Sequence, residues 1–204
     1  MNAALQWLAR FALGVSQQAI LIASLVVGLG IIVSNSEALL VLCLLGVYLL
    51  IGTVLSAIAS AELALAVILA GVFVALIMQF TAADLRSRRS HGPVGRRYYA
   101  LSALLGFFAM WVAFSVASRS RGLLLPQLIA LWLGLAALEV LLTTRAPFKA
   151  TVALLTLIGC SLLYYAGSTA EASLFVIGAM ALASFAVALA ASQLALWPGA
   201  RGEQ

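Results

Sequence analysis

The sequence predicts an all-α integral membrane protein with about seven transmembrane helices, arranged as two parallel three-helix repeats joined by a linking helix. Two observations predict the membrane class. Hydrophobic residues make up 65% of the 204 residues, and charged residues only 8%. The chain also contains successive runs of roughly 20 apolar residues, the length that crosses the hydrocarbon core of a bilayer. A soluble domain of this size does not bury enough residues to tolerate such a composition.

An internal similarity predicts the repeat. Residues 60–68 resemble residues 169–177 at an offset of 109 residues, which also pairs Gln18 with Gln127. Each copy holds three apolar spans and one further span lies between them, so both copies enter the membrane from the same side. A chance match between apolar segments is the alternative, and the shared three-span register argues against it.

The first three-helix repeat, residues 1–83, is divided by short polar breaks. Asn35 and Ser36 separate its first two spans, and Ser60 separates the second from the third. The first stretch lacks a clear small-x-small cleavage site, so we expect a retained span rather than a signal peptide. The predicted spans of this repeat are 11–33, 38–58 and 61–82.

A basic loop at residues 84–98 and a linking helix at 99–121 follow the first repeat. The second three-helix repeat covers 122–197 and a tail covers 198–204. Pro126 and Pro147 fall at the starts of predicted spans, where the missing N–H costs little. The predicted spans of this part are 100–117, 122–143, 148–166 and 171–196.

The distribution of basic residues predicts the orientation. With the basic loop in the cytoplasm, eight of the eleven Lys and Arg residues lie on the cytoplasmic side, and Arg10, Arg119 and Arg121 lie outside. We therefore expect a multi-pass protein of a bacterial or archaeal inner membrane, with the N-terminus outside and the C-terminus cytoplasmic. The loop arginines are candidate contacts to anionic lipids or a partner, with topology control as the alternative: Arg86, Arg88, Arg89, Arg96 and Arg97.

Glu139 is the candidate intramembrane acid. It is the one acidic residue inside a predicted span, about four residues from its cytoplasmic end. An ionisable residue at membrane depth is a functional candidate by default, so Glu139 is interpreted as a proton or cation relay facing the protein interior. The alternative is a structural carboxylate that pairs with a loop arginine such as Arg145 or contacts interfacial water.

Four further polar residues occupy paired positions in the two copies. Glu62 and Glu171 each open a span, where a carboxylate caps free N–H groups and interacts favourably with the helix dipole. The alternative is the outer mouth of a cation path. Gln18 and Gln127 lie inside the first span of each copy, where an amide hydrogen-bonds across helices.

The sequence predicts no catalytic, cofactor-binding or metal site. His91, the only histidine, lies in the basic loop without a second ligand nearby in sequence. Cys43 and Cys160 fall inside apolar spans and are expected to be small core residues without a disulfide. The basic residues lie in short loops between spans, where they set the orientation in the membrane. The net positive charge therefore does not predict a nucleic-acid partner.

The segment 133–150, followed by an apolar span and residues 170–173, resembles the small K subunit of respiratory complex I. Two such modules joined by a linking helix are similar to the E component of membrane complexes of the hydrogenase-4 and formate-hydrogenlyase type. The resemblance covers most of the chain. It implies a subunit of a redox-driven, ion-translocating membrane complex, with antiporter-like subunits as partners.

The chain departs from that family at its acidic positions. K-type subunits carry buried glutamates in their second and third helices, where they belong to the proton path. The corresponding segments 44–48, 70–73, 154–158 and 181–184 contain no acidic residue. The departure implies that this chain has lost proton conduction of the family's kind and serves as a non-catalytic bridging or sealing subunit without a cofactor.

Two other functions fit parts of the sequence. A small secondary transporter, like the sugar-exporting SWEET family, also has three-plus-one-plus-three parallel repeats, and Pro126-Gln127 resembles a pair in that superfamily. Such a transporter lines a midplane site with polar groups, and few are present here. A membrane enzyme acting on lipid would need clustered acids or histidines, which the sequence lacks.

Overall fold

The computed structural model describes residues 17–88, 125–144, 146–168 and 174–196. These residues form helices, with no strand among them. The helices are α2 (Gln17–Val33), α3 (Glu37–Ile58), α4 (Ala61–Arg88), α6 (Leu125–Thr143), α7 (Pro147–Ser168) and α8 (Leu174–Leu196).

Five of these helices are long and apolar enough to cross a membrane: α3, α4 up to Ala83, α6, α7, and α8 from Phe175 to Gln193. Helix α2 is a shorter apolar helix. The chain is therefore all-helical over its described part and has the helices of a multi-pass membrane protein, as the composition predicts. The predicted span 100–117 lies outside the described residues.

Helix α4 is longer than the predicted span 61–82. Its membrane-crossing part ends at Ala83, but the helix continues to Arg88, into the segment predicted as a loop. The extension contains Asp84 and two arginines, which end the apolar span without breaking the helix. The first helix breakers, Gly92 and Pro93, come only later in the sequence.

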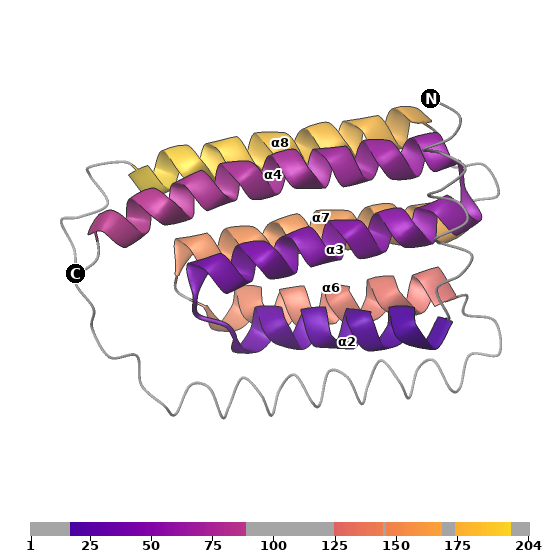
Figure 1. Ribbon diagram of the computed structural model, residues 1–204, viewed down its shortest axis with the longest axis horizontal. Helices are drawn as coiled ribbons and strands as arrows, with labels where there is room; N and C mark the ends of the chain where they lie inside the picture. The colour runs from indigo at the N-terminus through magenta and orange to yellow at the C-terminus, as the bar shows by residue number, and fades with distance from the viewer. Residues whose placement is uncertain (1–16, 89–124, 145, 169–173, 197–204) are drawn as a thin grey trace.

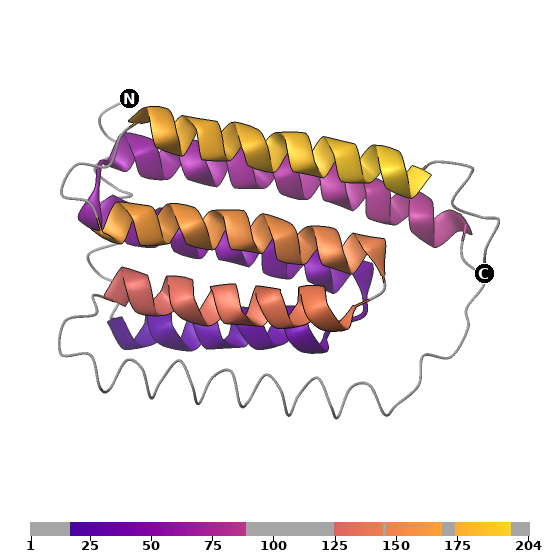
Figure 2. The same ribbon diagram turned by 180° about the vertical axis from the view of Figure 1, so that it is seen from behind.

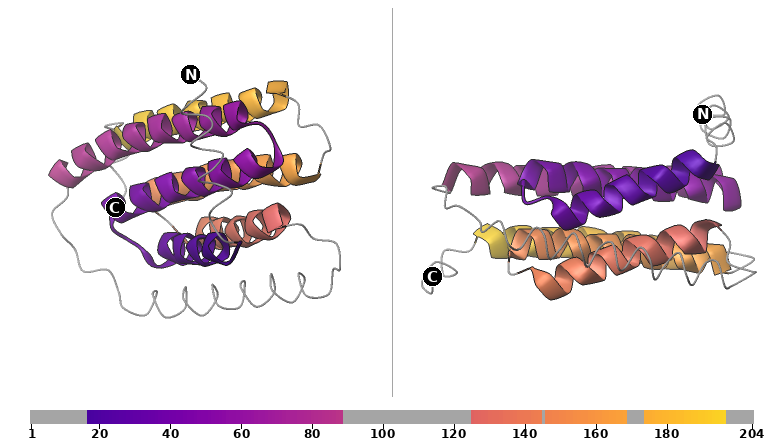
Figure 3. Two further views of the ribbon diagram at one scale, coloured as in Figure 1. Left: turned by 45° about the vertical axis from the view of Figure 1, so that its right-hand side comes forward. Right: turned by 90° about the horizontal axis from the view of Figure 1, so that it is seen from below.

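The helices form two layers, one of α2, α3 and α4 and the other of α6, α7 and α8 (Figure 3, right). Across the layers α2 packs on α6, α3 on α7 and α4 on α8. The members of each pair run in the same direction: α2 and α6 run from right to left in Figure 1, and α3 and α7 return from left to right. Figure 2 shows the same pairing from behind.

We call the two ends of this bundle the Asn35 end and the Ser60 end. The Asn35 end holds the C-termini of α2, α4, α6 and α8 and the N-termini of α3 and α7 (Figure 1). The Ser60 end holds the opposite termini of the same helices. Helix α4 therefore ends, and α6 begins, at opposite ends of the bundle.

The core lies between the layers and is centred on α3 and α7. Large side chains of these two helices are fully buried, among them Leu44, Ile51 and Leu55 of α3 and Leu155 and Leu163 of α7. In a bilayer the gain from such burial is van der Waals contact between helices rather than removal of apolar surface from water. Shape complementarity at the helix contacts therefore decides the stability.

Glycines set the closest helix approaches. A Cβ placed on Gly71 of α4 would collide with the side chain of Tyr48, which occupies the space beside it. A Cβ on Gly28 of α2 would lie 2.6 Å from Nε1 of Trp132. Small residues at helix interfaces allow this kind of contact in membrane proteins.

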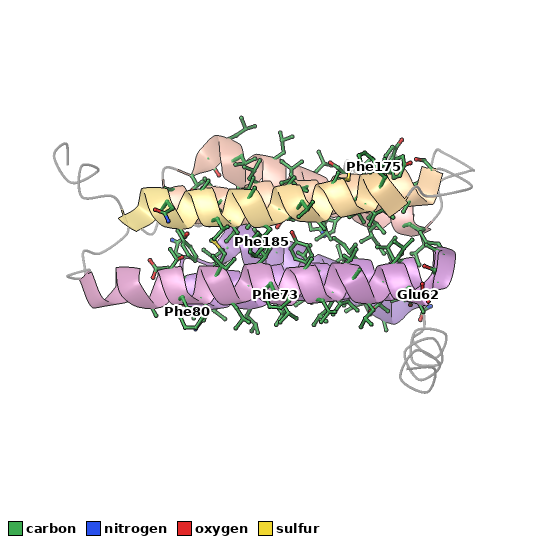
Figure 4. All side chains as sticks on the ribbon, turned by 90° about the horizontal axis from the view of Figure 1, so that it is seen from above. Glu62, Phe73, Phe80, Phe175 and Phe185 are labelled. Atoms are coloured by element: carbon green, nitrogen blue, oxygen red, sulfur yellow. The ribbon has the colours of Figure 1, made fainter. Side chains whose placement is uncertain are left out.

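The edge formed by α4 and α8 is the most open part of the bundle. Phe73 and Phe80 of α4 and Phe175 and Phe185 of α8 are exposed there (Figure 4). Apolar side chains on an outer face are the ordinary condition of a helix that contacts lipid or a neighbouring membrane subunit.

Candidate functional site

Glu139 lies inside the bundle, near the Asn35 end. It is four residues before the last residue of α6, and it is 9% exposed. Its neighbours Ala136, Ala137 and Val140 on the same helix are buried as well. Because α6 packs against α2 and α7, the buried carboxyl lies among protein side chains.

The Glu139 carboxyl has no hydrogen-bond partner among the described residues. Both of its oxygens are shielded, and neither accepts a hydrogen bond within the described part of the chain. Burying a carboxylate in this way is strongly unfavourable unless a charge or a bound species compensates it. The predicted pairing with Arg145 lies outside the described residues.

The other buried polar side chains, apart from Tyr48, differ from Glu139 because each hydroxyl donates to a carbonyl of its own helix. The distances are 2.8 Å for Ser24, 2.9 Å for Thr81, 2.9 Å for Thr156 and 3.0 Å for Ser184. Such back-bonding satisfies a hydroxyl without any second helix. An ionised carboxyl group has no proton to donate and cannot use this solution.

Lys149 is the cation nearest to this carboxyl among the described side chains that interact with it. It lies on the first turn of α7 and interacts electrostatically with Glu139. Its Nζ donates to the carbonyl oxygen of Ile32 at 2.7 Å and to Oδ1 of Asn35 at 3.3 Å. Lys149 thereby caps the C-terminal end of α2, where carbonyls lack helical partners and the dipole favours a cation.

The short turn between α6 and α7 brings the two charges to the same end. Thr143 Oγ1 donates to the Glu139 carbonyl at 2.8 Å. The N–H of Ala146 donates to Thr144 Oγ1 at 3.2 Å just before Pro147 opens α7. Proline suits this first helical position because its missing N–H would have no partner there.

The side chain of Tyr48 places a second buried polar group, its hydroxyl, deeper in the core. Its ring lies against Gly71 of α4, and its hydroxyl lies near Ser184 of α8 and Cys160 of α7. The hydroxyl is buried without a well-formed hydrogen bond in the described part of the chain. Three helices therefore converge on it, roughly midway along the bundle.

Trp132 joins the two layers near α2. Its Nε1 donates to the carbonyl of Ser24 at 3.0 Å, and the indole fills the space above Gly28. The hydroxyl of Ser24 is engaged separately, because it donates to the carbonyl of Leu21. Trp132 is a buried structural residue, although tryptophan is more usual at a membrane surface.

Glu62 lies exposed in the first turn of α4, at the Ser60 end (Figure 4). The side chain that caps this helix is that of Ser60, which accepts from the N–H of Leu63 at 3.2 Å. Glu62 occupies the position where a carboxylate interacts favourably with the helix dipole. Its predicted counterpart Glu171 lies outside the described residues.

The paired glutamines have different environments. Gln127 Nε2 donates to the carbonyl of Gly167 at 3.5 Å, an interhelical bond between α6 and α7 of the predicted kind. Gln18 is exposed at the start of α2. The equivalent positions therefore do not carry equivalent contacts.

The predicted lipid or partner contacts lie mostly beyond the described side chains. Arg86 and Arg88 are on the α4 extension, with only their helical backbone described, and Arg89, Arg96 and Arg97 fall outside. The cysteines are free: Cys43 is half-buried against Gly30, and Cys160 is buried. No cluster of three potential metal ligands occurs within the described residues.

Lys149 is the site residue that sequence reasoning missed, because it entered only as a charge that sets orientation. The sequence did contain a signal for this pair, because Lys149 follows Glu139 closely and a turn at Pro147 lies between them. Helices on either side of a short turn are antiparallel neighbours, so residues near the two helix ends approach each other.

No family model, no curated protein and no solved structure matches this chain.

Proposed function

We propose that this chain is a non-catalytic membrane subunit of a complex I-like, ion-translocating oxidoreductase of the hydrogenase type. It bridges or seals the membrane part beside antiporter-like subunits and binds no cofactor. In this proposal the chain consists of two parallel three-helix repeats and a linking helix, seven spans in all. The N-terminus is outside and the C-terminus cytoplasmic.

The observation that carries the proposal is the pairing of helices across the layers. Each helix of the first layer packs on the helix that follows it by about 109 residues, and both members of a pair run in the same direction. For example, α3 begins at Glu37 and α7 at Pro147. This arrangement supports a parallel tandem repeat of the kind that the resemblance implies.

The ends of α4 and α6 support the linking helix. Arg88 and Leu125, the described residues on either side of this connection, lie at opposite ends of the bundle. One additional span in this connection accounts for that geometry.

The polar content of the core supports a structural role. Most buried hydroxyls bond to their own helices, and the described interior contains one acidic residue, Glu139. A subunit that conducts ions on its own needs a continuous polar path. The open, aromatic α4–α8 edge fits a chain that packs laterally against lipid and other membrane subunits.

The test is purification of the tagged chain from its native membrane in a mild detergent, followed by mass spectrometry of the proteins that accompany it. We expect antiporter-like subunits together with iron–sulfur or nickel proteins. Membranes with the untagged chain are the control for non-specific capture. A stable particle that contains this chain alone would contradict the proposal.

A small secondary transporter is the second candidate, and the buried Glu139 near Lys149 favours it. A carboxyl and an ammonium inside a membrane bundle are typical of transport sites. Reconstitution of the purified chain in liposomes, with Glu139→Gln as the control, distinguishes this candidate because a transporter needs no partner subunit.

A further inference from the structure

The Glu139 carboxyl has no structural task in the described part of the chain. It caps no helix and makes no hydrogen bond, and its two oxygens are shielded. A glutamine or an apolar side chain would fill the same space without burying a charge. Direct contacts with the described side chains do not neutralise the carboxylate, so its charge has to be neutralised in another way.

Among the described residues, the helices around Glu139 carry two charged side chains near this end, Lys149 on α7 and Glu37 on α3. Helix α2 has no titratable side chain between Gln17 and Val33. On α7, Lys149 interacts with the carboxyl, but its ammonium is hydrogen-bonded to Ile32 and Asn35. On α3, Glu37 opens the helix at the same end of the bundle. Lys149 therefore compensates the carboxylate only from a distance.

Polar side chains at the Asn35 end become more buried from the surface toward Glu139. Asn35 is exposed at the end of the bundle, Lys149 is half-buried, and Glu139 is buried, so polarity extends from the surface inward. Because Lys149 bonds both Asn35 and the end of α2, these groups form a single polar site between the layers. Water hydrogen-bonded to such groups would carry protons between the Asn35 end and the carboxyl.

We propose that Glu139 is a proton-binding site, loaded from the Asn35 end of the bundle, with Lys149 as the positioning residue that balances its charged form. The carboxylate accepts a proton from water at that end and becomes a neutral carboxylic acid, and the reverse step returns the proton. All of these groups come from this chain, so the site does not depend on the proposed partner subunits.

The site is confined to one half of the molecule. The residue 109 positions before Glu139 is Gly30, where even a Cβ would lie 2.6 Å from Sγ of Cys43. The residue 109 positions before Lys149 is Leu40, which is buried. The first half therefore has neither the space for a carboxyl here nor the cation to balance it.

The test is infrared spectroscopy of the full chain in lipid bilayers during perfusion with buffers of increasing pH. A protonated carboxyl has a carbonyl stretching band that an ionised carboxylate lacks. We expect one such band to persist where exposed glutamates are ionised, to disappear reversibly at higher pH, and to be absent from Glu139→Gln. Glu62→Gln, which removes an exposed carboxyl, should leave it unchanged.

Lys149→Met tests the proposed role of Lys149 in balancing the charged form of Glu139. Without the ammonium the charged form loses its compensation, so we expect the band to persist to higher pH than in the unmodified chain. Glutamate labelled with ¹³C gives a check without any substitution, since it should move the band to lower frequency. Circular dichroism verifies that each variant folds.

Three results would overturn the proposal. The first is a carboxyl band that survives Glu139→Gln or is absent at every pH. The second is an unchanged titration in folded Lys149→Met, which would remove the role of that residue. The third is loss of the band on addition of Na⁺ at constant pH, which would assign the site to a metal cation rather than a proton.

Discussion

At the scale of single residues, small side chains and one indole determine how closely neighbouring helices approach, within a layer at Gly71 and between the layers at Gly28. Gly71 and Gly28 leave space that Tyr48 and Trp132 fill from other helices. In lipid the helices gain little from leaving their surroundings, so the contacts themselves carry the stability. A change of one methyl group at these positions should therefore be measurable.

Gly71→Ala is expected to destabilise the chain. The added Cβ collides with the Tyr48 side chain, and overpacking of this kind costs about 1–3 kcal/mol. Gly178→Ala is the matched control because nothing lies within 4 Å of its Cβ position. Replacing glycine in an open helix interior stabilises by about 0.5–1 kcal/mol. Unfolding by SDS in mixed micelles should shift in opposite directions for the two variants.

Trp132→Phe is expected to lower stability by about 0.5–2 kcal/mol. The phenyl ring retains most of the packing over Gly28 but cannot donate to the Ser24 carbonyl. The same unfolding titration measures the change. Equal stability of the two proteins would show that this hydrogen bond does not contribute, and Trp132→Leu would then report the packing alone.

At the scale of elements, the caps and turns explain where the helices begin. Ser60 caps α4, and Pro147 opens α7 after a turn held by Thr144. These local signals are present in the sequence and require no tertiary contact. They place the helix starts close to the positions expected from the polar breaks.

Ser60→Ala is expected to cost about 1 kcal/mol, confined to the first turn of α4. Hydrogen exchange of the backbone amide of Leu63 should become faster, because it loses its side-chain acceptor. Ser161→Ala is the control, since that exposed hydroxyl donates only to Leu157 of its own helix. Equal exchange at Leu63 in both variants would contradict the capping role.

The end of α4 and the Glu139–Lys149 pair show which features could be predicted from the sequence and which could not. Hydropathy located the end of the membrane span near Ala83, but it does not report helix formation beyond the apolar run. Glu139 was found because a charge within a span is conspicuous. Lys149 was not found, since its partners, Ile32 and Asn35, are more than 100 residues away in sequence. The packing of α2 on α6 brings them together.

At the scale of the whole molecule, the parallel layers predict which surface positions share a side of the membrane. Ser36→Cys and Thr143→Cys lie at the Asn35 end, and Ser60→Cys and Ser168→Cys at the Ser60 end, all at exposed residues. If the proposed orientation is correct, an impermeant maleimide labels the first pair from the cytoplasm and the second from outside, in a background lacking Cys43 and Cys160. Members of a pair that react from opposite sides would contradict the arrangement.

The pairing of α2 with α6, α3 with α7 and α4 with α8 also has a consequence for biogenesis. The ribosome completes the first layer, residues 17–88, before any of the helices that cover its inner face have been made. Until α6, α7 and α8 enter the membrane, that face must be held by lipid or by the insertion machinery. Translation that stops within the connection after Arg88 should therefore leave an incomplete product that membrane proteases recognise and remove.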